Sequence, residues 1–419
     1  MRALRPVLLC LLLAVPAVVV RLTSTELPSG LALLVFGVAV VASSFVLAWA
    51  AEAAEVDISG GLAIALLAVI AVLPEYAVDL YFAYTAGTRP EYVQYAAANM
   101  TGSNRLLLGL GWSLVVLLAL VVARRRTGRP VRQLVLDPSY RVEVGFLALA
   151  SLLALVVPAT GKIHLWLGLV LLGVFVFYLV RMATAGSDDE HDLVGPAARI
   201  GALPTRPRRT AVVAMFVVAA LVILASAKPF ADALVTTGES LGLDQFLLVQ
   251  WLAPLSSEAP ELIIAMIFAL RGKGAAALGL LVSAKVNQWT LLVGSLPVAY
   301  LFGGGSSSLV LDTRQVEEFT LTIAQTLMGI AVLLSLRFPR WAAWTLLALF
   351  AVQFGLPGTT ARLVLSGVYV VLAGIALVVN RRHVVPTLTA PFRRTPRLVT
   401  QTPVDERVLE PSGSAGPSR

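Results

Sequence analysis

The chain alternates long apolar segments with short polar loops that are rich in arginine. Several apolar segments reach the roughly 20 residues that a helix needs to cross a hydrocarbon core of about 30 Å. The backbone in lipid must satisfy its own hydrogen bonds, and the ten-residue alternation of a membrane barrel is missing. The pattern therefore predicts an all-α polytopic membrane protein with twelve spans, at about 5–22, 29–51, 60–85, 92–123, 142–158, 163–182, 211–237, 245–270, 275–303, 317–337, 341–355 and 361–380.

Composition agrees with this pattern. Of the 419 residues, 58% are hydrophobic and 13% are charged, and the mean hydropathy is +0.86. A soluble globular protein carries roughly 25% charged residues. The net charge of +8 comes mostly from loop arginines, which are typical topology determinants, so we expect no nucleic-acid partner. Cys10 is the only cysteine, which excludes intrachain disulfides and thiolate metal clusters.

The distribution of basic residues favours one orientation. The outer loops hold few basic residues, such as Arg89 and Lys162, if the N-terminus is cytoplasmic. The inner loops then receive the basic groups at 124–132, 199–209, 271–273, 337–340 and 381–382. The positive-inside rule places both termini in the cytoplasm, and we expect an integral protein of a bacterial plasma membrane. The first apolar segment is interpreted as a retained helix, because no clear small-x-small cleavage site follows it.

Two halves of the chain resemble each other. Pro74-Glu75 in the first half aligns with Pro260-Glu261 in the second. In the predicted topology the span with Glu75 runs outward and the span with Glu261 runs inward, so the duplication is inverted. Order and approximate spacing are kept in three matched pairs of segments: 61–80 with 247–266, 99–111 with 283–294, and 142–143 with 316–317.

The duplication predicts a layout for the whole chain. The segment between the halves is polar and rich in Gly and Pro, and the C-terminal segment has too few apolar residues to pack. We expect an extra membrane helix in 1–28, a first inverted repeat of five helices in 29–182 with its motifs at about 60–111, a cytoplasmic linker in 183–210, a second repeat in 211–355 with its motifs at about 245–297, an extra helix in 356–382, and a disordered tail in 383–419.

Two prolines lie within predicted spans. A proline inside a helix removes one backbone hydrogen bond and clashes with the carbonyl one turn earlier. Pro74 and Pro260 should therefore kink their helices and free the carbonyl groups of Ile70 and Ser256 as potential oxygen ligands.

Each proline is followed by a glutamate, Glu75 or Glu261. A charged group at the bilayer centre costs on the order of 2.5–3.5 kcal/mol, so two acids at equivalent positions indicate use rather than accident. The alternative is that they only pair with basic residues to lock the bundle, which is compatible with transport. Glu143 is also repeated, at Glu317, but we expect water to solvate it at the membrane edge.

Further oxygen-bearing side chains lie near these glutamates, and hard cations such as Na⁺ and Ca²⁺ bind such donors. Each hydroxyl or amide could equally form an interhelical hydrogen bond. The candidate ligands besides Glu75 and Glu261 are Glu258, Asp79, Asn99, Ser103, Asn104, Ser257 and Asn287.

Two basic residues accompany the candidate ligands inside apolar spans. Arg105 follows Asn104, and Lys285 stands two residues before Asn287. Buried bases lose least free energy beside buried acids, so both are expected to face the carboxylates as counter-charges. Glu258 and Glu261 are like charges on one helix face, which favours the protonated form of one of them and hence proton coupling.

These motifs resemble the cation/Ca²⁺ exchanger superfamily, which includes sodium/calcium and cation/proton exchangers. The resemblance lies in the two Pro-Glu pairs, in Gly102-Ser103-Asn104, and in a degraded copy, Lys285-Val286-Asn287. It implies antiport by alternating access, with Glu75 and Glu261 as the central, metal-binding carboxylates. The chain departs from the family at Ala71 and Val72, where the family places hydroxyl side chains.

The sequence thus predicts a secondary cation antiporter, with Na⁺/H⁺ or Ca²⁺/H⁺ exchange favoured and Na⁺/Ca²⁺ exchange also permitted. The alternative is a non-transporting or regulatory membrane scaffold in which Arg105 and Lys285 neutralise the site. We expect no enzyme and no catalytic residue, because no nucleophile and base are paired. The sequence contains no G-x-x-x-x-G-K-[ST] phosphate-binding loop, which disfavours ATP-driven transport. We expect no cofactor, only membrane lipid and transported Na⁺, Ca²⁺ or H⁺; the oligomeric state is left open.

Overall fold

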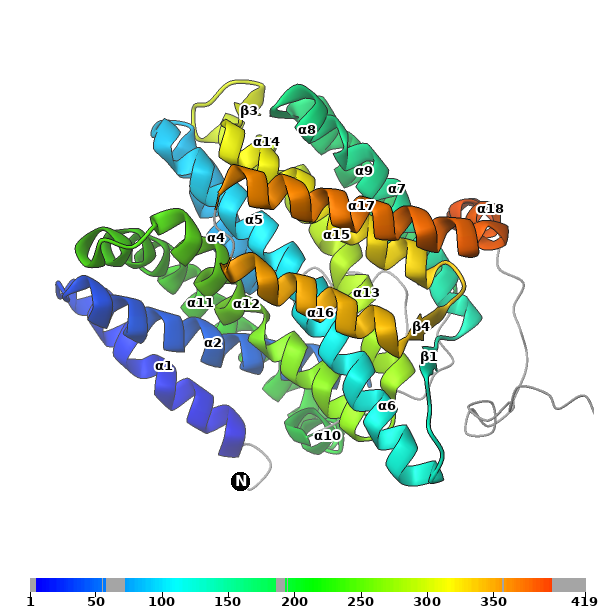
Figure 1. Cartoon of the computed structure of the whole chain (residues 1–419). Coiled ribbons are helices and arrows are strands. Elements are labelled where there is room, and N and C mark those ends of the chain that lie inside the picture. The colour runs from blue at the N-terminus through cyan, green and yellow to red at the C-terminus, as the bar shows by residue number, and fades with distance from the viewer. Residues whose placement is uncertain are drawn as a thin grey trace, which may run out of the picture.

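The computed structural model describes residues 5–54, 56–57, 72–185, 193, 195–355 and 358–393. The fold is a bundle of helices with two small two-stranded sheets (Figure 1). Within these residues, ten helices are long and apolar enough to cross a membrane: Arg5–Thr23, Ser29–Ala54, Pro90–Thr127, Pro138–Thr160, Leu165–Ala183, Thr205–Leu241, Gln245–Leu270, Gly274–Phe302, Thr313–Leu333 and Thr359–Val379.

The first half consists of α1 (Arg5–Thr23), α2 (Ser29–Ala54), α4 (Leu73–Ala86), η2 (Pro90–Tyr92), α5 (Val93–Leu106), η3 (Leu107–Trp112), α6 (Ser113–Thr127), η4 (Pro138–Tyr140), α7 (Arg141–Ala154), α8 (Val156–Thr160) and α9 (Leu165–Ala185). A short helix, α10 (Gly195–Gly201), follows in the predicted linker. The second half consists of α11 (Thr205–Leu241), α12 (Gln245–Leu270), α13 (Gly274–Asn287), η5 (Gln288–Leu292), α14 (Val293–Phe302), α15 (Thr313–Leu333), α16 (Arg340–Gly355), α17 (Thr359–Val379), η6 (Arg381–His383), α18 (Val384–Thr389) and η7 (Ala390–Phe392).

Two of the twelve predicted spans are not among the ten long helices. The span at 341–355 is α16, which has 16 residues. The span at 60–85 is represented by α4, and residues 58–71, including the predicted carbonyl ligand Ile70, lie outside the described part of the chain. Pro74 stands in the first turn of α4, where proline is tolerated because the first N–H groups have no partner in the helix.

Two small sheets join the halves at opposite ends of the bundle. Strand β1 (Gln133–Val135), which precedes α7, pairs antiparallel with β4 (Arg337–Pro339), which follows α15. Strand β2 (Lys162–His164), which follows α8, pairs antiparallel with β3 (Ser308–Val310), which precedes α15. Exchanging the two halves converts one pairing into the other, and Figure 1 shows β1 beside β4 far from β3.

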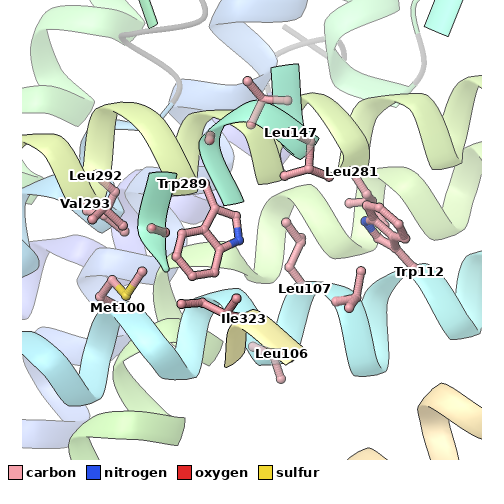
Figure 2. Packing of buried hydrophobic residues seen from close by; sticks show 14 of the residues in the cluster. Met100, Leu106, Leu107, Trp112, Leu147, Leu281, Trp289, Leu292, Val293 and Ile323 are labelled. Atoms are coloured by element: carbon pink, nitrogen blue, oxygen red, sulfur yellow. The ribbon is translucent and has the colours of Figure 1, made fainter. Parts of the chain in front are cut away.

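Each half also contains one π-helical segment in an equivalent place. Segment η3 follows α5 directly, and η5 follows α13 directly. Such segments are rare and occur frequently at functional sites. Both are buried, and Figure 2 shows Trp289 of η5 with Leu107 and Trp112 of η3 in the apolar core.

The C-terminal residues are more ordered than the sequence suggested. Helix α17 packs along α15, and α18 and η7 pack on α7. Thr387 is 1% exposed, and its hydroxyl accepts a hydrogen bond of 2.9 Å from Nη1 of Arg141. The expectation of disorder from residue 383 is therefore wrong for residues 384–392, because apolar and hydrogen-bonding contacts to α7 hold them. Residues 394–419 lie outside the described part.

Candidate functional site

Acids from the two halves meet in the centre of the bundle. Glu75 of α4 and Glu258 of α12 are 6% and 1% exposed. The side-chain amide of Gln288 donates to both, at 3.3 Å to Oε1 of Glu75 and 2.6 Å to Oε1 of Glu258. Gln288 belongs to η5 and was not among the predicted ligands. Its position directly after the candidate ligand Asn287 could have identified it in the sequence. One amide thus holds a carboxyl group from each half.

Two further acids flank this pair. Asp79, one turn after Glu75, is fully buried and accepts a hydrogen bond of 2.7 Å from Nδ2 of Asn99. Glu261 is partly exposed and interacts electrostatically with Glu75. Of the two acids of α12, Glu258 is therefore more deeply buried than Glu261.

The structure places Lys285 among these acids. Its side chain is fully buried, and Nζ donates a hydrogen bond to the main-chain carbonyl oxygen of Asn104 on α5. It interacts electrostatically with Glu258 and Glu75, and Nζ lies 5.9 Å from the centre of the Trp289 ring. We call the group of Glu75, Asp79, Glu258, Glu261, Lys285 and Gln288 the central site.

Several oxygen atoms around the central site have no hydrogen-bond partner among the described residues. An unpartnered buried polar atom costs on the order of 1–3 kcal/mol, so a cluster of them fits a cation as the missing partner. The atoms are Oδ2 of Asp79, Oδ1 of Asn99, Oδ1 of Asn104, Oε2 of Glu258, Oδ1 of Asn287 and Oε1 of Gln288.

The predicted hydroxyl ligands lie in two environments. Ser103 is fully buried beside the carboxyl groups of Glu75 and Glu258. Ser257 is 5% exposed, and its hydroxyl donates within α12, to the carbonyl oxygens of Ala253 and Pro254 at 3.2 and 3.3 Å. Pro260 lies inside α12, where it leaves the carbonyl of Ser256 without its helical donor.

Arg105 does not face these acids. Its Nη2 lies 2.5 Å from Oε2 of Glu318 on α15, and its Nη1 donates to Oε1 of Gln353 at 3.1 Å. The expected pairing of Arg105 with the central carboxylates is wrong, because successive helix residues point about 100° apart. While Asn104 lies near Lys285, Arg105 therefore points toward α15 and α16.

Glu318 belongs to a second buried group of charges. Arg362 of α17 lies 2.9 Å from Oε2 of Glu317 and 3.6 Å from Oε1 of Glu318. Gln250 donates to Oε2 of Glu318 at 3.1 Å. We call Arg105, Glu317, Glu318 and Arg362 the Arg105–Glu318 network; its two acids and two bases balance. In the sequence, Glu318 and Arg362 could have been recognised as charged residues just inside the ends of two predicted apolar spans.

Glu143 is also buried, which corrects another expectation. It is 8% exposed, and the hydroxyl of Ser283 donates to its Oε1 at 2.8 Å. Water does not solvate it, because α13 covers it at the membrane end of α7. The guanidinium group of Arg141 instead donates to the carbonyl oxygen of Leu334 at 3.1 Å.

A helix bundle with a buried, oxygen-rich acidic centre built from two halves defines an ion-transporting membrane protein. The sequence pattern of the sodium/calcium exchanger protein family matches residues 28–184 and 211–356 separately. The chain belongs to this family.

Solved structures agree with that assignment. The chain is 39% identical to the H⁺/Ca²⁺ exchanger CAX, over 94% of this chain and 98% of that one, with a TM-score of 0.87. Native YfkE is 17% identical over 87% and 99% of the two chains, with a TM-score of 0.57. The sodium-calcium exchanger NCX_Mj is 18% identical over 79% and 99%, with a TM-score of 0.51. The last two share the fold. No match was found among curated proteins.

Proposed function

We propose that the chain exchanges Ca²⁺ for protons across a bacterial plasma membrane, with both termini in the cytoplasm. The observation that carries this proposal is the meeting of Glu75 and Glu258 at the amide of Gln288, among buried oxygens that have no hydrogen-bond partner in the described part of the chain. The similarity to an H⁺/Ca²⁺ exchanger over 94% of the chain supports the choice of Ca²⁺ and protons among the ions that the sequence permits.

The central carboxyl groups explain how exchange is coupled. Ca²⁺ takes six to eight oxygen ligands, and ionised carboxylates, amide oxygens and backbone carbonyls all serve. Protons neutralise the same carboxyl groups that the metal ion requires in ionised form. Because Glu75, Glu258 and Glu261 hold either the cation or the protons, one substrate leaves as the other binds. Asn99, Ser103, Asn104, Asn287 and Ser257 complete the proposed ligand set.

Alternating access is the second part of the proposal. The two halves are two inverted repeats of five helices, and α1 and α17 are additions at either end. Three features support this arrangement: the family pattern matches each half separately, the sheets pair β1 with β4 and β2 with β3, and each half has a π-helical segment beside the site. Rocking of one part of the molecule against the other would open the site to either face in turn.

The scaffold alternative requires Arg105 and Lys285 to neutralise the acids together. Arg105 is already paired with Glu318, so of these two bases Lys285 alone faces the central acids, and its single charge cannot neutralise both Glu75 and Glu258. The proposal therefore retains transport, without enzymatic activity and without a bound cofactor.

Flux through purified protein tests the proposal. Liposomes that contain the protein should take up ⁴⁵Ca²⁺ when an outward proton gradient is imposed, and acidification of the medium should follow Ca²⁺ loading. An imposed Na⁺ gradient at constant pH is the control and should drive little uptake. Uptake driven by Na⁺ alone would reassign the counter-ion, and no uptake of ⁴⁵Ca²⁺ or ²²Na⁺ under any gradient would favour the scaffold.

A further inference from the structure

Lys285 occupies a place in the central site that a mobile cation could occupy. Its ammonium group carries one positive charge and three hydrogen-bond donors. One donor goes to the carbonyl oxygen of Asn104, and the charge lies in the field of Glu258 and Glu75. A backbone carbonyl together with carboxylates is the oxygen environment that alkali and alkaline-earth cations take in proteins.

The equivalent position in the other half of the molecule is a glycine. When Asn104 is aligned with Asn287, Lys285 corresponds to Gly102. A Cβ atom at Gly102 would lie 1.7 Å from the carbonyl oxygen of Gln250, so α5 rests directly on α12 and no side chain fits there. At the corresponding position of α13, a long side chain reaches across to α5 and delivers a charge into the site.

We propose that the Lys285 ammonium is a tethered monovalent cation that permanently fills one cation subsite, formed by the Asn104 carbonyl and the Glu258 and Glu75 carboxyl groups. The substrate cation and protons then share only the remaining oxygens. This inference rests on the proposed function for the location of the site. It adds that an alkali cation is excluded by a built-in competitor, and that removing the charge exposes a subsite for Na⁺ or a similar ion.

Binding of ²²Na⁺ to the purified full chain tests this inference. Lys285→Met keeps the length of the side chain and removes the charge, whereas Lys285→Arg keeps the charge and is the matched control. We expect Lys285→Met to bind about one more Na⁺ per chain than wild type, because one ammonium charge has been removed. Lys285→Arg should bind no more than wild type. ⁸⁶Rb⁺ tests whether the opened subsite also takes a larger ion.

Transport provides a second readout. In the absence of Ca²⁺, liposomes that contain Lys285→Met should take up ²²Na⁺ at least about tenfold faster than liposomes that contain wild type. A tenfold change lies within the usual range by which one bound ligand alters the binding of another, here the lysine ammonium and Na⁺. Lys285→Gln replaces Lys285→Met if the latter does not purify as a single folded species.

The outcomes separate the two proposals. A folded, uncharged variant at position 285 that binds no more Na⁺ than wild type overturns the tethered cation. Wild-type protein that moves no Ca²⁺ under a proton gradient overturns the proposed function, while the difference in ²²Na⁺ binding between wild type and Lys285→Met still decides the inference.

Discussion

The central site and the Arg105–Glu318 network are both buried groups of charges in one helix bundle, and they differ in balance. In the network, Arg105 and Arg362 meet Glu317 and Glu318, and every carboxyl group has a guanidinium partner. The central site contains four acids and one lysine, and several of its oxygens have no hydrogen-bond partner among the described residues. A balanced buried group holds helices together, whereas an unbalanced one requires a mobile positive charge. Charge balance thus distinguishes the Arg105–Glu318 network from the proposed site of transport.

The largest effect is expected from removing a central acid. Glu258→Gln should lower proton-driven ⁴⁵Ca²⁺ uptake at least about 100-fold, because ligand charge strongly tunes Ca²⁺ affinity. Glu75→Gln and Glu261→Gln should also abolish transport while the protein remains inserted in the membrane. Uptake is measured in liposomes matched for protein content. Wild-type uptake by any of the three would remove that carboxyl group from the mechanism.

The next effect concerns stability rather than transport. Glu318→Gln leaves Arg105 buried without its partner, and breaking a buried pair in this way costs about 3–5 kcal/mol. The melting temperature of the purified protein should fall by about 5 °C or more. The double variant Arg105→Met with Glu318→Leu removes both charges and should recover most of the loss. A Ca²⁺ affinity changed as much as by Glu258→Gln would show that the network belongs to the site.

Substitution of Glu143 should have a smaller effect than substitutions in the central site or in the Arg105–Glu318 network. Glu143→Gln keeps an oxygen that accepts from Ser283, so it exchanges one hydrogen bond for another, a change of about 1 kcal/mol or less. Transport should stay within about twofold of wild type under the same gradient. A loss comparable to that of Glu258→Gln would make this acid a further functional carboxyl group and end its interpretation as structural.

The smallest effect is expected from removing an ion pair outside the membrane, which should change the melting temperature only slightly. Asp57, after α2, accepts hydrogen bonds of 2.7 and 2.8 Å from Arg208, which lower the pKa of Asp57 from 3.8 to about 2. Its contribution to stability is therefore present above about pH 4 and is lost as the pH falls toward 2. Asp57→Asn should lower the melting temperature slightly at pH 7, and the difference from wild type should shrink below pH 4. A difference that is constant between pH 7 and pH 3 would contradict this account.

The sequence predicts the membrane bundle well, because apolar length and loop arginines are properties of single segments. It also identifies Glu75 and Glu261 as the central acids and Glu258 as a further candidate, since a carboxyl group in an apolar span is costly wherever it points. The structure instead joins Glu75 to Glu258 through Gln288. Partners are harder to predict. Arg105 and Asn104 are neighbours in sequence but point to different helices, and nothing local shows that α15 supplies Glu318.

Residues near span ends are the other weak point of prediction. Glu143 and Arg362 lie within a few residues of predicted helix ends, where hydropathy alone suggests contact with water. The structure buries Glu143 because α13 packs over it, and it brings Arg362 of α17 to the acids of α15. The order of residues 384–392 has the same origin, since it depends on contacts with α7 that lie far away in the sequence.

The release of protons on Ca²⁺ binding tests the central claim most directly. Ca²⁺ is added to weakly buffered, detergent-purified protein near neutral pH, and the released protons are counted with a pH-sensitive dye. If the same carboxyl groups hold either the metal ion or protons, wild type should release protons in proportion to bound Ca²⁺, and the double variant Glu75→Gln with Glu258→Gln should release none. Tight binding of Ca²⁺ to wild type without any release of protons would contradict the account.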